Sequence, residues 1–416
     1  KTAMVSYKKI LLGLFVGTAA GLSSHFFWSD APALEWILQN IADPTGKIFL
    51  KLIFMLVIPI IFSAIALGIS AMSDLKTLGR IGLRTLLYTI IVSSIAVFIG
   101  ILLVNCFEPG AGFTPEQRAE LLRSMGKTFS HTVAPPQLGA SFLVDLVPEN
   151  PLAAATNGQI LPFMFFAVMF GIGLVLAPSE KTKVIRNFLD ELFHISIRLI
   201  TVVMRAAPLG VAALLFALTA RFGWSLLEKL GGFVLVVLGA MTIHQFIVYP
   251  LILKFVARTS PIDFFKKIRL VMVTAFATSS SNVTLPTALE VGEKVLKISP
   301  RVNQFVLTVG STTNQNGTAL FEGIVVLFLA QFFGIDLSFG AQVLVVLLSI
   351  LSGIGTAGVP SGSLPVIAAL LVSLGIPAEG IGLILGIDRI LDMCRTVLNV
   401  TGDMVAARVI DRFEKT

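Results

Sequence analysis

The residues best able to do chemistry lie near the end of the chain, within the otherwise apolar stretch Ile381–Val409. Its charged and hydrogen-bonding side chains include Asp388, Asp392, Arg395, Thr396, Asn399 and Asp403. At about 100° per residue they fall within roughly a 100° arc of one helix. A guanidinium can hold a carboxylate through two hydrogen bonds, while Asp392 could hold an ammonium and Asp403 a cation. The face therefore predicts a site for a zwitterion with an extra carboxylate.

The same face could instead be a structural ladder of salt bridges that needs no ligand. Asp392 and Arg395 are spaced i, i+3, which allows them to pair on one helix. A ladder leaves Asp388 and Asp403 without an evident basic partner there, although Arg389 could supply part of one. Both interpretations require that the face avoids lipid.

The composition indicates where this helix must lie. Of 416 residues, 55% are hydrophobic and 13% are charged, about half the usual charged fraction. Several apolar runs are long enough to cross the roughly 30 Å core of a bilayer. They are Ile10–Trp28, Leu52–Met72, Leu86–Phe107, Ile160–Pro178 and Leu230–Leu253. A further run, Ile195–Ala220, contains two arginines and Pro208, so it is either a long tilted helix or one packed against protein. We predict an integral membrane protein.

The net charge of +7 is spread over the connections between apolar runs, which argues against a nucleic-acid partner. Basic residues concentrate in alternate connections, so both termini are predicted to be cytoplasmic in a plasma (inner) membrane. The two cysteines, Cys106 and Cys394, carry no disulfide or metal pattern.

Three interruptions break the apolar runs in the last third of the chain. The first is Thr278–Thr284, and the second, Gly353–Ser363, is the centre of 42 uncharged residues, 337–378. A lipid-facing helix would not carry the polar run of the first, and the Gly/Pro-rich centre of the second cannot be continuous helix, which predicts two re-entrant hairpins whose tips face protein or water. The third, Gly310–Thr318, would expose carbonyl oxygens that suit a small cation, or it is a polar helix interface with a glycine kink.

At these motifs the chain resembles the dicarboxylate/amino acid:cation symporter family, which includes the glutamate and aspartate transporters. The resemblance is carried by Ser281 to Pro286, Asn314 to Thr318, Gly355 to Pro360 and Asn399 to Asp403. It implies an all-α membrane protein with eight transmembrane helices, two re-entrant hairpins and an elevator movement, assembled as a homotrimer among membrane lipids. Scaffold parts would be 1–80 and 109–225, and transport-domain parts 81–108 and 226–416.

The resemblance also implies a secondary symporter, not an enzyme, that takes up aspartate, glutamate or a C4-dicarboxylate. Arg395 would bind the side-chain carboxylate of the substrate and Asp392 its amino group, and the second hairpin would be the gate. The implied substrate set is Ser281, Thr318, the backbone of Val359, Asp392, Arg395, Thr396 and Asn399. No organic cofactor is implied, and Na⁺ or H⁺ would be the coupling ion.

Two sodium sites are implied by the family pattern. One uses carbonyls of Gly310, Asn314 and Asn399 with the Asp403 carboxylate, and the other uses carbonyls around Thr312, Gly353, Ile354 and Thr356. A third site in well-studied members uses an aspartate, a tyrosine and a threonine. Here those positions match Asn316, Thr89 and Val92, so a charge and an oxygen are missing. We predict that the third site is absent or very weak.

Weaker sodium coupling would leave room for a proton. Asp388 and Asp403 are the favoured proton carriers, with His244 as a less favoured relay. Two other classes stay open from sequence: an anion-channel-like protein, and an intramembrane enzyme with Ser281 or Ser361 as nucleophile, although no histidine lies in either hairpin. Sequence does not decide between sodium and proton, or between aspartate, glutamate and dicarboxylate.

Overall fold

The computed structural model describes residues 7–29, 31–71, 79–112, 114, 144, 146–177, 179–355 and 362–415. The regular secondary structure in these ranges is helical, and they contain no strand. The predicted site residues Thr356 and Val359, together with Ser361, lie outside them.

The first half of the described chain forms ten of the helices. They are α1 (Tyr7–Trp28), α2 (Pro32–Ile37), η1 (Leu38–Ala42), α3 (Asp43–Phe54), α4 (Val57–Ala71), α6 (Arg80–Phe107), α9 (Pro151–Thr156), α10 (Ile160–Leu176), α11 (Ser179–Val203) and α12 (Ala207–Phe222). Those of the second half are α13 (Trp224–Ile243), η3 (His244–Val248), α14 (Tyr249–Leu251), η4 (Ile252–Val256), α15 (Pro261–Thr278), α16 (Ser281–Lys294), α17 (Pro300–Thr313), α18 (Asn316–Phe333), α19 (Phe339–Gly355), α20 (Leu364–Ser373), η5 (Ala378–Gly380) and α21 (Ile381–Lys415).

Five helical stretches in the described residues are long and apolar enough to cross a membrane. They are Lys9–Trp28, Pro32–Ser70, Arg80–Phe107, Trp224–Val256 and Pro300–Phe333. Residues 180–222 make a sixth if the bent pair α11 and α12 is one span. All five overlap predicted features, but the second begins at Pro32, well before the predicted Leu52.

The prediction of one long tilted helix over Ile195–Ala220 is wrong. The chain bends by 59° between α11 and α12. Pro208 sits in the first turn of α12, where its missing N–H costs nothing, whereas further into a continuous helix it would remove a hydrogen bond. The proline therefore starts a second helix.

Two of the predicted interruptions are present as helix breaks, which confirms those predictions. The first lies at Ser279 and Ser280, between α15 and α16, where Ser279 adopts a left-handed φ of 51°. The Ser280 hydroxyl then accepts from the Val283 N–H at 3.3 Å and caps α16. The other lies at Asn314 and Gln315, between α17 and α18. At the second predicted interruption, Gly353–Ser363, α19 ends at Gly355 and α20 begins at Leu364.

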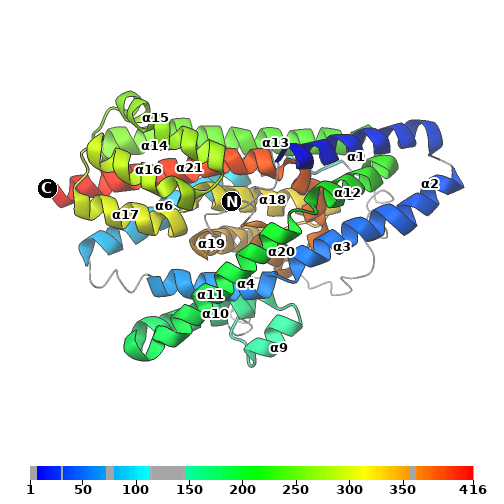
Figure 1. The fold of residues 1–416 in the computed structure, drawn as a ribbon. Coiled ribbons are helices and arrows are strands. Elements are labelled where there is room, and N and C mark those ends of the chain that lie inside the picture. Colours follow the sequence, from blue (N-terminus) through cyan, green and yellow to red (C-terminus); the bar gives the residue numbers. More distant parts are fainter. Residues whose placement is uncertain are drawn as a thin grey trace.

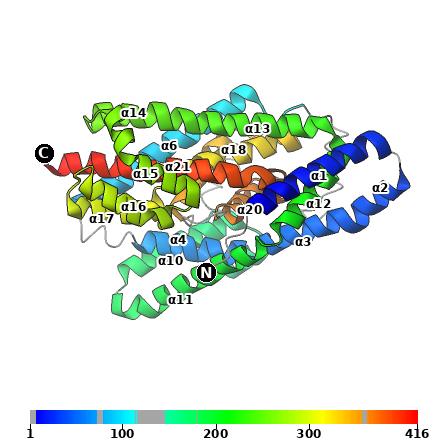
Figure 2. The ribbon, with the colours of Figure 1, turned by 45° about the horizontal axis from the view of Figure 1, so that its top comes forward.

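Helix α21 runs through the middle of the molecule, between α13 on one side and α17 and α18 on the other (Figures 1 and 2). The base of the α15–α16 pair lies at its C-terminal end, where Arg408 Nε donates to Thr259 Oγ1 at 3.0 Å. Helix α20 leads through η5 into its N-terminal end. Helices α1, α3 and α12 gather beyond that end (Figure 1). The polar side chains in the middle of α21 are thus enclosed by other helices, whereas Lys415 at its C-terminal end is exposed.

Candidate functional site

The polar face of α21 is buried inside the bundle. Its six predicted side chains are at most 4% exposed: Asp388, Asp392, Arg395, Thr396, Asn399 and Asp403. Charged groups at such a depth are stable only when paired with charges, hydrogen bonds or a ligand. Their neighbours therefore indicate what the site can hold.

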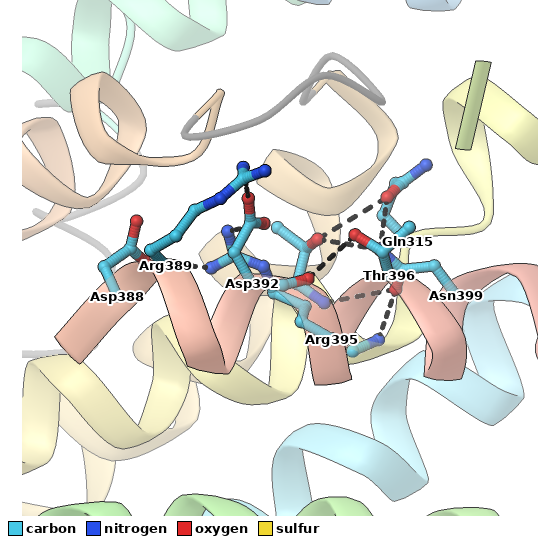
Figure 3. Close-up of polar contacts among 9 residues, drawn as sticks. Gln315, Asp388, Arg389, Asp392, Arg395, Thr396 and Asn399 are labelled. Carbon is cyan, nitrogen blue, oxygen red and sulfur yellow. Dashed lines mark hydrogen bonds and ion pairs between the residues drawn. The ribbon is translucent and has the colours of Figure 1, made fainter. Parts of the chain in front are cut away.

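Arg395 is held by charges on its own helix and by a ring of α18. Its Nη2 atom donates to Asp392 Oδ1 at 2.5 Å, and its Nη1 atom lies 3.7 Å from Asp388 Oδ1 (Figure 3). Its guanidinium carbon lies 4.6 Å from the centre of the Phe321 ring. The pairing proposed for a salt-bridge ladder is therefore present.

The pairing nevertheless leaves Arg395 incomplete. Within the described ranges its Nη1 atom is buried and donates no hydrogen bond, because 3.7 Å to Asp388 is too long. A buried donor without an acceptor costs about 1–3 kcal/mol, and more when charged. A carboxylate from a ligand would remove this cost.

Asn399 joins α21 to the break between α17 and α18. Its Oδ1 atom accepts from the backbone N–H groups of Gly317 at 2.7 Å and Thr318 at 3.3 Å. Its Nδ2 atom donates to Gln315 Oε1 at 2.5 Å and to Thr318 Oγ1 at 3.1 Å (Figure 3). Asn399 thus caps α18 from another helix, since the residue at the start of α18 provides no side-chain cap. Thr318, a predicted substrate residue, is held in the same network.

Asp403 lies one turn further along α21, beside the end of α17. Its Oδ1 atom accepts from Asn314 Nδ2 at 2.9 Å, and a Cβ on Gly310 would lie 2.6 Å from the same atom. No basic side chain in the described part of the chain lies within 4 Å of this carboxylate. The structure therefore brings together the predicted first cation set, Gly310, Asn314, Asn399 and Asp403.

The residues predicted to replace the third cation site lie on two helices that pack against each other, Thr89 and Val92 on α6 and Asn316 on α18. Thr89, Val92 and Asn316 are each at most 3% exposed. The Ser93 hydroxyl donates to Asn316 Oδ1 at 2.6 Å, and Asn316 Nδ2 donates to the Tyr249 hydroxyl at 3.2 Å. Both ends of the amide are occupied.

The remaining predicted residues are less closely tied to α21. Ser281 is buried at the start of α16 and makes no hydrogen bond within the described ranges. Thr312 is exposed on α17, and Gly353 lies against Gln315. Ile354 is placed in α19. His244 is fully buried with neither ring nitrogen bonded to described atoms, and its ring packs edge-on against Tyr249.

Sequence reasoning missed Glu322 on α18. It is 0% exposed, and its electrostatic neighbours are Ser352 and Arg395. Ser352 lies beside the carboxyl, but neither oxygen meets the geometry of a hydrogen bond, and no basic nitrogen of the described chain lies within 4 Å. A signal was available, because Glu322 is the single charged residue between Arg301 and Asp336.

The chain as a whole is similar to a known family of proteins. The model of the sodium:dicarboxylate symporter family matches residues 7–413. The chain belongs to this family. It is 35% identical over 410 residues to the proton/glutamate-aspartate symporter of Escherichia coli (strain K12), covering 98% of this chain and 92% of that protein. It is 34% identical over 424 residues to the proton/sodium-glutamate symport protein of Bacillus subtilis (strain 168), covering 98% and 94%.

A third relative is the C4-dicarboxylate transport protein of Rhizobium leguminosarum, 32% identical over 413 residues that cover 98% of this chain and 89% of that protein. Membership of the symporter family makes this chain a transporter and not an enzyme. Together with its apolar helices, it also makes the chain a multi-pass membrane protein. The predictions of the family, of a transport function and of a multi-pass membrane protein are confirmed.

Proposed function

We propose that the protein is a secondary symporter that takes up aspartate or glutamate across the plasma membrane, with C4-dicarboxylates as alternative substrates. Arg395 carries the proposal: its Nη1 atom belongs to a buried cation and has no hydrogen-bond acceptor among the described residues. A substrate carboxylate supplies that acceptor. Asp392, Thr396 and Asn399 follow on the same face, where they serve the ammonium and the second carboxylate of the substrate (Figure 3).

Uptake of radiolabelled aspartate into proteoliposomes tests the assignment. R395C removes the guanidinium, and we expect it to abolish saturable uptake while the purified variant keeps its melting behaviour. R395K is the matched control: it keeps the charge without the fork, so we expect strongly weakened but detectable uptake. If R395C keeps the wild-type affinity for aspartate, the assignment is wrong.

We propose further that the third sodium site is lost. The support is the local network, in which Asn316 already satisfies Ser93 and Tyr249 while Val92 contributes no oxygen. An amide there offers no formal charge to compensate a desolvated cation. We expect the sodium dependence of aspartate affinity to be shallow or absent. A steep dependence corresponding to three ions would refute this.

A proton takes over part of the coupling, and Glu322 is the carrier that we propose in addition to Asp388 and Asp403. Glu322 is fully buried in α18, and neither of its carboxyl oxygens meets the geometry of a hydrogen bond with a described residue. Once ionised, it would attract the Arg395 guanidinium and compete with the substrate carboxylate. Protonation of Glu322 therefore strengthens substrate binding, and by linkage the substrate strengthens proton binding.

The E322Q variant tests this proton carrier. We expect it to lose accumulation driven by a pH gradient and to keep exchange of labelled against unlabelled aspartate, because glutamine mimics the neutral carboxyl. D388N and D403N serve as comparisons. Undiminished gradient-driven accumulation by E322Q would exclude Glu322, and loss in D403N alone would favour Asp403.

Several finer features of the family expectation stay part of the proposal. They are the homotrimer, the division into scaffold and transport parts, the elevator movement, the eight spans with two re-entrant hairpins, and cytoplasmic termini. The approach of α15–α16 and α19–α20 to opposite ends of α21 supports oppositely oriented hairpins.

A further inference from the structure

A second arginine shares the Asp392 carboxylate. Arg389 Nη1 lies 3.6 Å from Asp392 Oδ2, while Arg395 Nη2 bonds the other oxygen, Oδ1 (Figure 3). Asp392 is therefore bracketed by two guanidinium groups, one per oxygen. The family-implied role of Asp392, binding the substrate ammonium, competes with this arrangement, because a second cation already lies against the same carboxylate.

The two arginines are not equivalent. The Arg395 side chain is 3% exposed, makes a hydrogen bond at 2.5 Å and lies over the Phe321 ring. The Arg389 side chain is 13% exposed and contacts Asp392 at a distance too long for a hydrogen bond. Arg389 is thus the weaker partner, and its long side chain can leave the carboxylate by rotation.

The four charged side chains around Asp392 carry no net charge. Asp388 and Asp392 supply two negative charges, and Arg389 and Arg395 supply two positive ones. A dicarboxylic amino acid that binds Asp392 places its ammonium beside the Arg389 guanidinium, and repulsion between these two cations favours the displacement of Arg389. A dicarboxylate without an amino group leaves Arg389 in place, and the arginine then keeps Asp392 neutralised.

We infer that Arg389 is a specificity-determining residue: it occupies Asp392 in place of a substrate ammonium and so lets the site accept dicarboxylates that lack one. This inference rests on the proposed transport function. It makes amino-acid binding a competition between two cations for one carboxylate. It also places the choice between the two substrate classes in the Asp392–Arg389 pair, and not in Arg395, which binds a carboxylate of either class.

Succinate is the suitable probe because it is aspartate without the ammonium. We would measure the affinity for aspartate and the inhibition of labelled aspartate uptake by succinate, in wild-type protein and in R389Q. We expect succinate to inhibit the wild type. In R389Q we expect the succinate affinity to fall by about tenfold or more relative to that for aspartate. A purely structural role of Arg389 would weaken both ligands together.

Further variants keep the test decisive. R389L, which keeps the packing of the aliphatic stem, is a second neutral variant if R389Q does not fold. R408Q is the matched control on the same helix, since Arg408 binds Thr259 and Asp411 far from Asp392, and we expect its affinity ratio to equal that of the wild type.

An unchanged ratio in the neutral Arg389 variants would overturn the inference. So would a wild-type protein that transports aspartate without inhibition by succinate, and both results leave the proposed function standing. Only a wild-type protein that transports neither class would remove the proposed function as well.

Discussion

Asn316 donates a hydrogen bond from its amide nitrogen to the hydroxyl of Tyr249 at 3.2 Å. The direction of this hydrogen bond is fixed, because the Tyr249 hydroxyl donates its own proton to the Leu398 carbonyl at 3.0 Å. One hydroxyl therefore connects α18, α14 and α21 at the place where the third cation would bind. The contact stabilises an amide at position 316 and disfavours a carboxylate.

Replacing the amide by a carboxylate tests that point. N316D would face the Tyr249 hydroxyl with an acceptor and add a buried charge, so we expect a loss of about 1–3 kcal/mol of stability without sodium. Combined with V92T, it should regain stability as sodium is added, because a cation that binds only the folded state stabilises it. Melting temperatures in sodium and in choline would measure this. A sodium response equal to that of the wild type would contradict it.

Removing the bridging hydroxyl should weaken the bundle. Y249F leaves the buried Asn316 amide nitrogen without its acceptor and removes the second hydrogen bond of the Leu398 carbonyl, which keeps its bond within α21. We expect a loss of about 1–3 kcal/mol. Thermal unfolding in detergent would show it, and Y88F is a suitable control because the Tyr88 hydroxyl bonds to none of the described residues. Equal melting of the two variants would speak against the bridge.

The same contact explains a glycine on α21. A Cβ on Gly402 would lie 2.5 Å from the Tyr249 hydroxyl oxygen and 2.7 Å from Asn316 Nδ2, closer than real Cβ atoms come. We expect G402A to cost about 1–3 kcal/mol and to lower uptake, because the amide network must shift. G239A on α13 is the control, since a Cβ there meets no described atom within 4 Å and alanine favours helix. Similar melting temperatures of G402A and G239A would contradict the claim that the Tyr249–Asn316 contact requires glycine at position 402.

Glu379 makes the structure sensitive to pH near neutrality. It lies in η5, which precedes α21, and lines a cavity of about 30 Å³ with Asp43, Lys47 and Arg221. Arg221 is held by Asp43 at 2.8 and 3.0 Å. Burial raises the pKa of Glu379 from 4.5 to about 7, despite the attraction of Lys47.

A raised pKa means that the folded state binds this proton more tightly than the unfolded state. The stabilisation is complete below pH 4.5 and is lost as the pH rises towards 7. We expect wild-type protein to lose on the order of 1–3 kcal/mol between pH 4.5 and 7.5. E379Q should remove most of that slope. An E379Q slope as steep as that of the wild type would assign the effect to another group.

Sequence alone predicted the polar face of α21 and two of the helix breaks, because each rests on local chemistry. Charged residues spaced along an apolar helix must share a protected face, and glycine, serine and asparagine clusters interrupt helices wherever the fold places them. The pairing of Asp392 with Arg395 follows from the same spacing.

Other features depend on residues far apart in sequence. Asn399 caps α18 across 82 positions to Gly317, and Ser93 reaches Asn316 across 223, so neither contact has a local signature. The position of Glu322 beside Arg395 depends on how α18 packs against α21. The bend before α12 was missed because the two arginines suggested tilt, whereas Pro208 begins a new helix.

The break between α17 and α18 has an electrical consequence. The carbonyl end of α17 and the amide end of α18 meet across Asn314 and Gln315, so opposite half-charges of two helix dipoles lie within a few residues of each other. A cation attracted to the first end and an anion attracted to the second would then neutralise one another at short range. Such a junction favours joint occupancy over single occupancy, which is the thermodynamic requirement for moving two solutes together.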